Sequence, residues 1–405
     1  MHVIDTSSRA IAALMEFKVT PRKECKGRKR WQLGLGVSLG IIMPNLLAVA
    51  PAYAHVKWFA PYVVGAAPAP VGETLANGWF WLGLVLVLAF FAATVAIERS
   101  KIGPQVSGLL DYVGNPLWSR ADDFMRAIVA AFFVAIFAVG GVYLTPDLQT
   151  PNEWVSWLQL LIALLVFSRR TMPLAAAGII GLWVIALRDY DFFHLLDYLA
   201  LGVGVAGYLA LAADPAGKWY KHRFAILRWG VAIALMWSSL EKFAYAEWFY
   251  PLVEERPFLT FGMPRDTFIP MAGVAEFTMG FGLLWSPLIR RLSAISLLII
   301  FITAVYPFGR IDLVGHALIM GTLFLSAADP TPSGLKITGL APALGSVPAG
   351  LVAAIVVIAG SYWGLHGVFY DYTQDQSRPV AADGQLLTHL PNAEQPHGAI
   401  APVQP

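Results

Sequence analysis

Apolar stretches recur along most of this chain, and they constrain its fold more than any other feature. Each is roughly 16 to 21 residues long, which suits an α-helix that crosses the hydrocarbon core of a bilayer. Because the bilayer offers no partners for backbone N–H and C=O groups, such a stretch must form a helix. Of the 405 residues, 57% are hydrophobic and only 13% are charged. The sequence therefore predicts an all-α, polytopic transmembrane bundle whose main partner is the lipid bilayer.

The N-terminal region has the layout of a secretory signal peptide. A basic run over residues 18–30 is followed by an apolar stretch over 31–50 and then by the small-residue pattern Ala52-Tyr53-Ala54. We expect residues 1–54 to be a signal peptide whose removal leaves His55 at the N-terminus. The alternative is an N-terminal helix that is not cleaved, which also leaves His55 on the outer side.

The distribution of Lys and Arg predicts the topology, since cytoplasmic loops carry an excess of both. With His55 outside, most of the expected inner loops are basic and most outer loops are not. This places the mature N-terminus and the C-terminus in the periplasm of a bacterial inner (plasma) membrane protein. The formal net charge of +2 gives no indication of nucleic-acid binding. The ten expected crossings are 78–97, 127–144, 154–167, 173–187, 193–212, 224–239, 268–285, 292–306, 313–327 and 347–368, with an interfacial segment over 107–126.

Two parts of the chain resemble each other and predict a tandem four-helix repeat. In the first, Arg188 precedes His194 by six residues, and in the second Arg310 precedes His316 by six. Both parts continue through an apolar helix to the same four letters, AADP. Four crossings return the chain to its starting side, so the units share one orientation. We expect segments at 55–119 (outer segment, helix and interfacial segment), 120–221 (first repeat), 222–336 (second repeat), 337–369 (last helix) and 370–405 (disordered outer tail).

The second repeat resembles the DoxX-like family of membrane proteins. The likeness is carried by Arg228 and Gly230, by the sequence EKF at Glu241, and by GVAEFTMGFGLLWSPLIRRLSA from Gly273. Family members include a subunit of thiosulfate:quinone oxidoreductase, so the resemblance implies a redox or quinone-linked setting. The first repeat departs from the pattern, because apolar residues near Val155 stand where Glu276 would fall.

Several ionisable residues gather at the expected outer side of the membrane, where such residues are candidates for function. The single cysteine, Cys25, excludes a disulfide or thiolate metal site within one chain. Imidazoles with carboxylates beside them suit copper or another transition metal, and the same groups could hold a quinone. Glu276 and Glu241 are the candidate cofactor-binding residues. The candidate metal ligands are His55, His194, His316, Asp312, His366 and Asp191.

Three functions are compatible with these features. The leading hypothesis is a redox-associated protein that binds copper or quinone at the periplasmic side. The second is a proton- or cation-coupled transporter of small solutes, in which Glu276 would be the coupling site. The third is a non-catalytic anchor for a periplasmic redox partner. The sequence leaves open which of these applies, and whether the protein is an enzyme.

Overall fold

The apolar stretches of the sequence form helices close to the expected positions. The computed structural model describes residues 65–306, 308–332 and 339–370, all within one compact unit of the chain. The expected signal peptide, His55 and the tail beyond residue 370 lie outside the described residues. Within the described ranges there is no strand, and the only β-type pairing is an isolated bridge between Val142 and Gln149. The all-α prediction is confirmed.

Helices lie at the positions of the ten predicted crossings, and one further helix, α6, lies near the predicted interfacial segment. Helical segments containing α5, α10, α11, α15, α16 and α17 are long and apolar enough to cross a membrane. In chain order the long helices are α5 Gly78–Arg99, α6 Gly103–Trp118, α7 Ala121–Val139, α8 Glu153–Leu165, α9 Met172–Ala186, α10 Phe192–Ala212, α11 Arg223–Ser239, α14 Arg265–Gly282, α15 Pro287–Val305, α16 Arg310–Ala328 and α17 Leu340–Phe369. The short elements are α4 Val71–Ala76, η1 Tyr220–His222, α12 Glu241–Ala244, η2 Ala246–Phe249, α13 Tyr250–Glu255 and η3 Pro257–Thr260.

Local sequence explains where several helices begin. The side chain of Asp191 accepts a hydrogen bond from the backbone N–H of His194 at 2.9 Å and so caps α10. Gly309, at φ 82°, precedes α16 in a conformation that a side chain would strain. Pro287 opens α15 where its missing N–H costs nothing. The sequence predicts that this helix begins at residue 292, but it begins at Pro287. Arg290 and Arg291 therefore belong to the helix and not to a loop.

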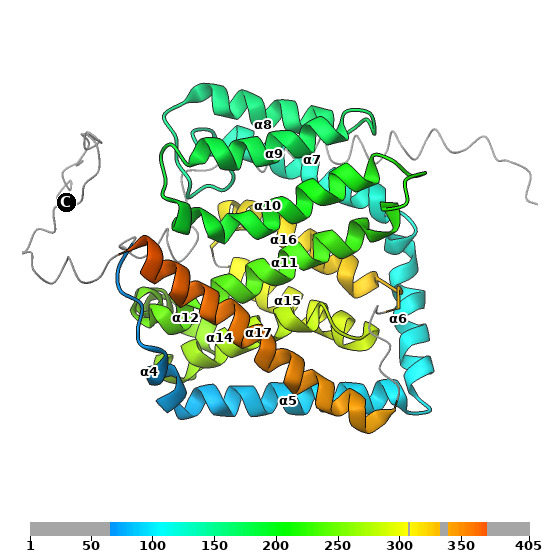
Figure 1. The fold of residues 1–405 in the computed structure, drawn as a ribbon, viewed down its shortest axis with the longest axis vertical. Helices are drawn as coiled ribbons and strands as arrows, with labels where there is room; N and C mark the ends of the chain where they lie inside the picture. Colours follow the sequence, from blue (N-terminus) through cyan, green and yellow to red (C-terminus); the bar gives the residue numbers. More distant parts are fainter. Residues whose placement is uncertain (1–64, 307, 333–338, 371–405) are drawn as a thin grey trace, which may run out of the picture. The chain divides into compact units, whose positions relative to one another are not determined.

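Eight of the long helices pack in two groups that follow one another in the sequence. The first group is α7 to α10, and the second is α11, α14, α15 and α16. Contacts join α7 to α8, α8 to α9 and α9 to α10, and then α11 to α14, α14 to α15 and α15 to α16. The last helix of each group contacts the first helix of the other, α10 against α11 and α16 against α7 (Figure 1). Such an exchange of contacts is what two similarly oriented four-helix units would make around a shared axis. Helix α5 packs against the second group, and α17 contacts α5, α10, α11 and α14.

Helix α6 runs across one end of the bundle in Figure 1 and contacts α5, α7 and α16. The Arg291 guanidinium on α15 donates to the Asp111 carboxylate on α6 at 2.5 Å. Gly114 lies so close to Ala328 that a Cβ there would be 2.9 Å from the Ala328 Cα. Exposed Leu109, Tyr112 and Val113 cover the outward face of α6. This helix occupies the end of the bundle that the sequence assigns to the inner membrane surface.

Candidate functional site

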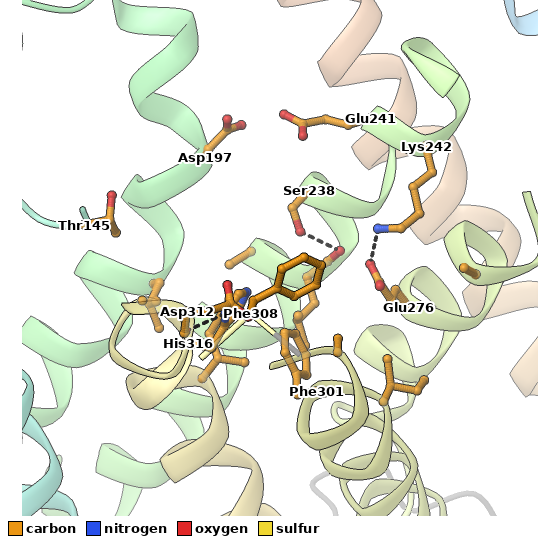
Figure 2. A pocket seen from close by; sticks show the side chains of 18 of the residues that line it. Thr145, Asp197, Ser238, Glu241, Lys242, Glu276, Phe301, Phe308, Asp312 and His316 are labelled. Carbon is orange, nitrogen blue, oxygen red and sulfur yellow. Dashed lines mark hydrogen bonds and ion pairs between the residues drawn. The ribbon is translucent and has the colours of Figure 1, made fainter. Parts of the chain in front are cut away.

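A cavity of about 670 Å³ lies where the two helix groups meet. Its walls come from α7, α10, α11 and α16, which are the first and last helices of the two groups, together with α14, α15 and the outer loop between α12 and α14. Much of the lining is apolar and aromatic. Its polar lining residues include Thr145, Asp147, Asp197, Ser238, Glu241, Lys242, Glu276, Thr303, Asp312 and His316 (Figure 2).

One wall carries an ion pair between α12 and α14. The Lys242 ammonium donates to the Glu276 carboxylate at 2.6 Å, and both side chains are mostly buried, at 15% and 18% exposed. The same ammonium lies 5.0 Å from the centre of the Phe249 ring, within the range of a cation–π contact. Lys242 is therefore held by both a carboxylate and an aromatic face.

The opposite wall carries a second polar pair within α16. Nδ1 of His316 lies 3.2 Å from a carboxylate oxygen of Asp312 and 2.9 Å from its backbone carbonyl oxygen. The spacing of four residues puts both side chains on one face of the helix. Phe301 of α15 packs against the imidazole with ring centres 5.1 Å apart. The backbone carbonyl and the carboxylate of Asp312 together fix the orientation of this imidazole.

Two more carboxylates face the cavity from α10 and α12. Asp197 accepts a hydrogen bond from the indole N–H of Trp237 at 2.8 Å. Figure 2 shows the carboxylates of Asp197 and Glu241 pointing toward one another from different walls. Asp147, which also lines the cavity, accepts hydrogen bonds from the hydroxyl groups of Tyr198 and Thr145. Ionisable groups from both helix groups thus converge on one space.

Asp197 and Asp312 occupy matching positions in the two groups. Asp197 lies 15 residues before Ala212 and Asp312 lies 15 residues before Ala327, the first letters of the two AADP sequences. The histidines do not match in this register, because His194 is 18 residues before Ala212 and His316 is 11 before Ala327. Seven residues of helix correspond to about 10 Å of rise. The aspartates, and not the histidines, form the equivalent pair at the cavity.

A buried amide in the first group takes the place of Glu276. Gln159 lies six residues before Leu165, the end of α8, as Glu276 lies six before Gly282, the end of α14. The side-chain amide of Gln159 donates to the backbone carbonyl groups of Val142 and Tyr143 at 2.5 and 2.7 Å. The sequence predicts apolar residues near Val155 at this place, whereas the ends of the two helices align Glu276 with Gln159, four residues further on. In this group the position supports the outer loop.

The remaining candidate ligands lie away from the cavity lining. His366 on α17 is hydrogen-bonded through Nε2 to the Tyr245 hydroxyl at 2.9 Å, and its ring contacts Phe193. Asp191 accepts a hydrogen bond from the Tyr370 hydroxyl at 2.6 Å.

His194 stacks on Tyr190 with ring centres 5.5 Å apart and is buried. It lies at the start of α10 and is not among the cavity-lining residues.

These positions bear on metal binding. Among the described residues, no three His, Cys, Asp or Glu side chains lie close enough together to hold a metal ion. The cavity instead has one imidazole with one adjoining carboxylate. Since the chelating amine of the copper hypothesis belongs to His55, which lies outside the described residues, copper binding stays a prediction.

A second polar cluster, at the other end of the second group, was not predicted. Asp329 is 1% exposed, and its carboxylate pairs with the guanidinium groups of Arg228 and Arg290. Its backbone carbonyl accepts from Arg290 at 3.0 Å and from Arg291 at 2.8 Å. The repeated AADP sequence was the available signal, but only the second copy is surrounded by buried arginines.

The helices and cavity together define a multi-pass helical membrane protein with a ligand-sized space between two four-helix groups. No family model, curated protein or solved structure matches the chain. The likeness to the DoxX-like family therefore stays a prediction that rests on the residues quoted above.

Proposed function

We propose that this protein binds a small amphipathic solute in the cavity and carries it across a bacterial inner membrane in exchange for protons. The observation that supports this proposal most strongly is the position of the cavity. It lies between two similarly built helix groups and is lined by ionisable groups from both. Carriers with internal repeats place their substrate and coupling sites at such an interface. The expected topology makes the cavity face the periplasm.

The two polar pairs in the walls supply the coupling. Ionisable groups inside a membrane are costly, and those that persist often serve proton or ion pathways. The Lys242–Glu276 pair joins the short helix α12 to α14, whereas the Asp312–His316 pair lies within α16. A solute that takes over one partner of a pair leaves the other partner to gain or release a proton. Binding and proton movement thereby become linked at one site.

Glu276→Gln is expected to lower solute uptake at least tenfold, because the amide keeps the size of the side chain but cannot carry the charge that pairs with Lys242. The measurement is uptake into proteoliposomes under an imposed pH gradient, with a panel of cationic, neutral and anionic amphipathic solutes. Asp214→Asn is the control, since Asp214 is exposed and does not line the cavity. A wild-type protein that moves no member of the panel faster than empty liposomes would refute the transport proposal.

Quinone binding is a second candidate, favoured by the hydrogen-bond donors in an aromatic cavity. A quinone head group accepts hydrogen bonds, and the Lys242 ammonium and His316 imidazole could donate them beside Phe301 and Phe308. A bound quinone would supply electron and proton transfer, whereas the chain supplies the donors and the apolar walls. Saturable quenching of tryptophan fluorescence by a short-chain quinone, weakened at least tenfold in His316→Ala, would support this candidate. Equal quenching in both proteins would argue against it.

A further inference from the structure

We infer that the cavity opens sideways into the bilayer and that its ligand is a neutral lipid, whose uncharged polar head lies in the cavity while its hydrocarbon chain extends into the membrane. This inference rests on the proposed role of the cavity as a binding site for an amphipathic solute, and it specifies the chemical class of that solute. Three features of the described residues support it: an opening at membrane depth, an apolar rim on the outer loop, and an ion pair that a charged head would disturb.

The cavity lining includes an exposed side chain of α15. Ile299 lines the cavity, and yet it is 62% exposed. Thr303, one turn further along the helix, also lines the cavity and is partly exposed. A residue that both lines a cavity and is exposed lies at an opening of that cavity. Ile302 is 51% exposed on the same helix but is not among the cavity-lining residues, so the opening lies to one side of α15.

This opening lies at the depth of the hydrocarbon core and level with a polar group. Ile299 lies six residues before Val305, the expected outer end of α15, and His316 lies six residues after Arg310, the expected outer end of α16. At a rise of 1.5 Å per residue, each lies about 9 Å below the end of its helix. The bilayer is hydrocarbon at that depth. A molecule that enters beside Ile299 therefore passes directly from hydrocarbon to a polar wall, which suits an amphipathic molecule and not a hydrated ion.

Apolar residues of the outer loop form a rim at the same cavity. Phe261 and Met263 line the cavity from the loop before α14 and are 72% and 36% exposed. Within the described part of the chain, Phe261 is the only residue other than glycine with a positive φ, at 53°. Such a conformation is unfavourable for a bulky residue and is often found where a protein holds a ligand. The loop therefore places a large apolar side chain at the rim, where a hydrocarbon chain can pack against it.

The ion pair in the cavity wall favours an uncharged head. Lys242 and Glu276 are mostly buried, and their charges compensate each other at 2.6 Å. A charged head would compete with one partner for the other, and separating a buried pair is costly. A hydroxyl or carbonyl head can instead accept a hydrogen bond from the ammonium, and a hydroxyl can also donate one to the carboxylate. The cavity volume of about 670 Å³ is in the usual range for small ligands, so it can hold such a head while the chain stays in the bilayer.

A photoactivatable lipid tests the inference. A monoacylglycerol with a diazirine in its palmitoyl chain is added at low mole fraction to phospholipid nanodiscs that contain the full-length protein. After irradiation, labelled peptides are identified by mass spectrometry. We expect labelling of the outer half of α15 that excess unlabelled monopalmitoylglycerol reduces at least fivefold, because a cavity saturates and the general lipid-facing surface does not. A phosphatidylcholine with the same diazirine chain should label the protein without responding to this competitor.

Two substitutions on α15 test the opening itself. Ile299→Trp should reduce the competable labelling at least fivefold, because the larger side chain obstructs the opening from a position that is already exposed. Ile302→Trp is the matched control, since Ile302 is exposed on the same helix and is not part of the cavity lining. Its competable labelling should equal that of the wild type. Far-ultraviolet circular dichroism should show the same helix content in all three proteins.

The outcomes separate the ligand class from the role of the cavity. Wild-type labelling that the competitor does not reduce, or competable labelling that is as strong with the phosphatidylcholine probe, would overturn the neutral-lipid inference. Equal competable labelling of Ile299→Trp and Ile302→Trp would overturn the sideways opening. If the lipid label is not competed but proteoliposomes take up a solute in a manner that depends on Glu276, this inference fails and the proposed function stands. If the wild type shows neither competable labelling nor uptake, both fail.

Discussion

Asp329→Asn is expected to destabilise the folded protein by about 3–5 kcal/mol, the cost of removing one partner from a buried ion pair. The Asp329 carboxylate is 1% exposed and is the acidic partner of Arg228 and Arg290. Asparagine keeps the shape but removes the negative charge, which leaves two buried guanidinium groups without compensation. The backbone carbonyl of residue 329 still accepts hydrogen bonds from Arg290 and Arg291 in the variant. The measured loss of stability therefore reports the removal of the side-chain charge.

The other AADP sequence provides the matched control. Asp214 holds the equivalent position, but it is exposed and its carboxylate accepts only a local hydrogen bond, from the Ala216 backbone at 3.1 Å. Asparagine can accept the same bond, so Asp214→Asn should change stability by less than about 0.5 kcal/mol. Unfolding midpoints in mixed detergent micelles measure both variants. Combining Asp329→Asn with Arg290→Met should recover part of the loss, because it removes one of the uncompensated charges.

Equal midpoints for Asp329→Asn and Asp214→Asn would show that the buried cluster contributes little to stability. Failure of the double variant to recover stability would show that the loss comes from packing and not from uncompensated charge.

The difference between the two AADP sequences marks the limit of sequence reasoning at this end of the molecule. Arg290 and Arg291 fit the pattern of basic residues that the sequence predicts for an inner loop. This pattern does not indicate that the two arginine side chains are buried. Their burial depends on α15 beginning at Pro287 and on the end of α16 placing Asp329 beside Arg290. The corresponding residues of the first group, Arg169 and Arg170, are exposed. Equivalent sequence patterns therefore have different roles in the two groups.

At the cavity, the sequence predicts several of the polar groups but not the space between them. The cost of ionisable residues in apolar helices predicts Glu241, Glu276, Asp312 and His316 as site residues, and all four line the cavity. The same cost predicts His366, but its helix lies against another part of the bundle, where its imidazole bonds to Tyr245. The sequence predicts which polar residues share a face of one helix, as Asp312 and His316 do. The aromatic walls, contributed by helices distant in sequence, depend on tertiary packing.

Gly230→Val is expected to destabilise the bundle by about 3 kcal/mol, at the upper end of the cost of overpacking. A Cβ at Gly230 would lie 2.7 Å from the Ala200 carbonyl oxygen and 2.7 Å from the Gly204 Cα. These are backbone atoms, so relief requires α10 and α11 to separate. Small residues permit such close approach between membrane helices. Because α10 and α11 both line the cavity, separating them should also weaken binding of the short-chain quinone.

Gly181→Val is the matched control for this last effect, because a Cβ at Gly181 on α9 meets nothing within 4 Å. Its unfolding midpoint should stay close to that of the wild type, and its affinity for the short-chain quinone should not change. A destabilised Gly230→Val protein that binds the quinone normally would show that the junction of α10 and α11 supports the fold without shaping the cavity. Joint loss of stability and affinity would show that the contact between the two helix groups is what forms the binding site.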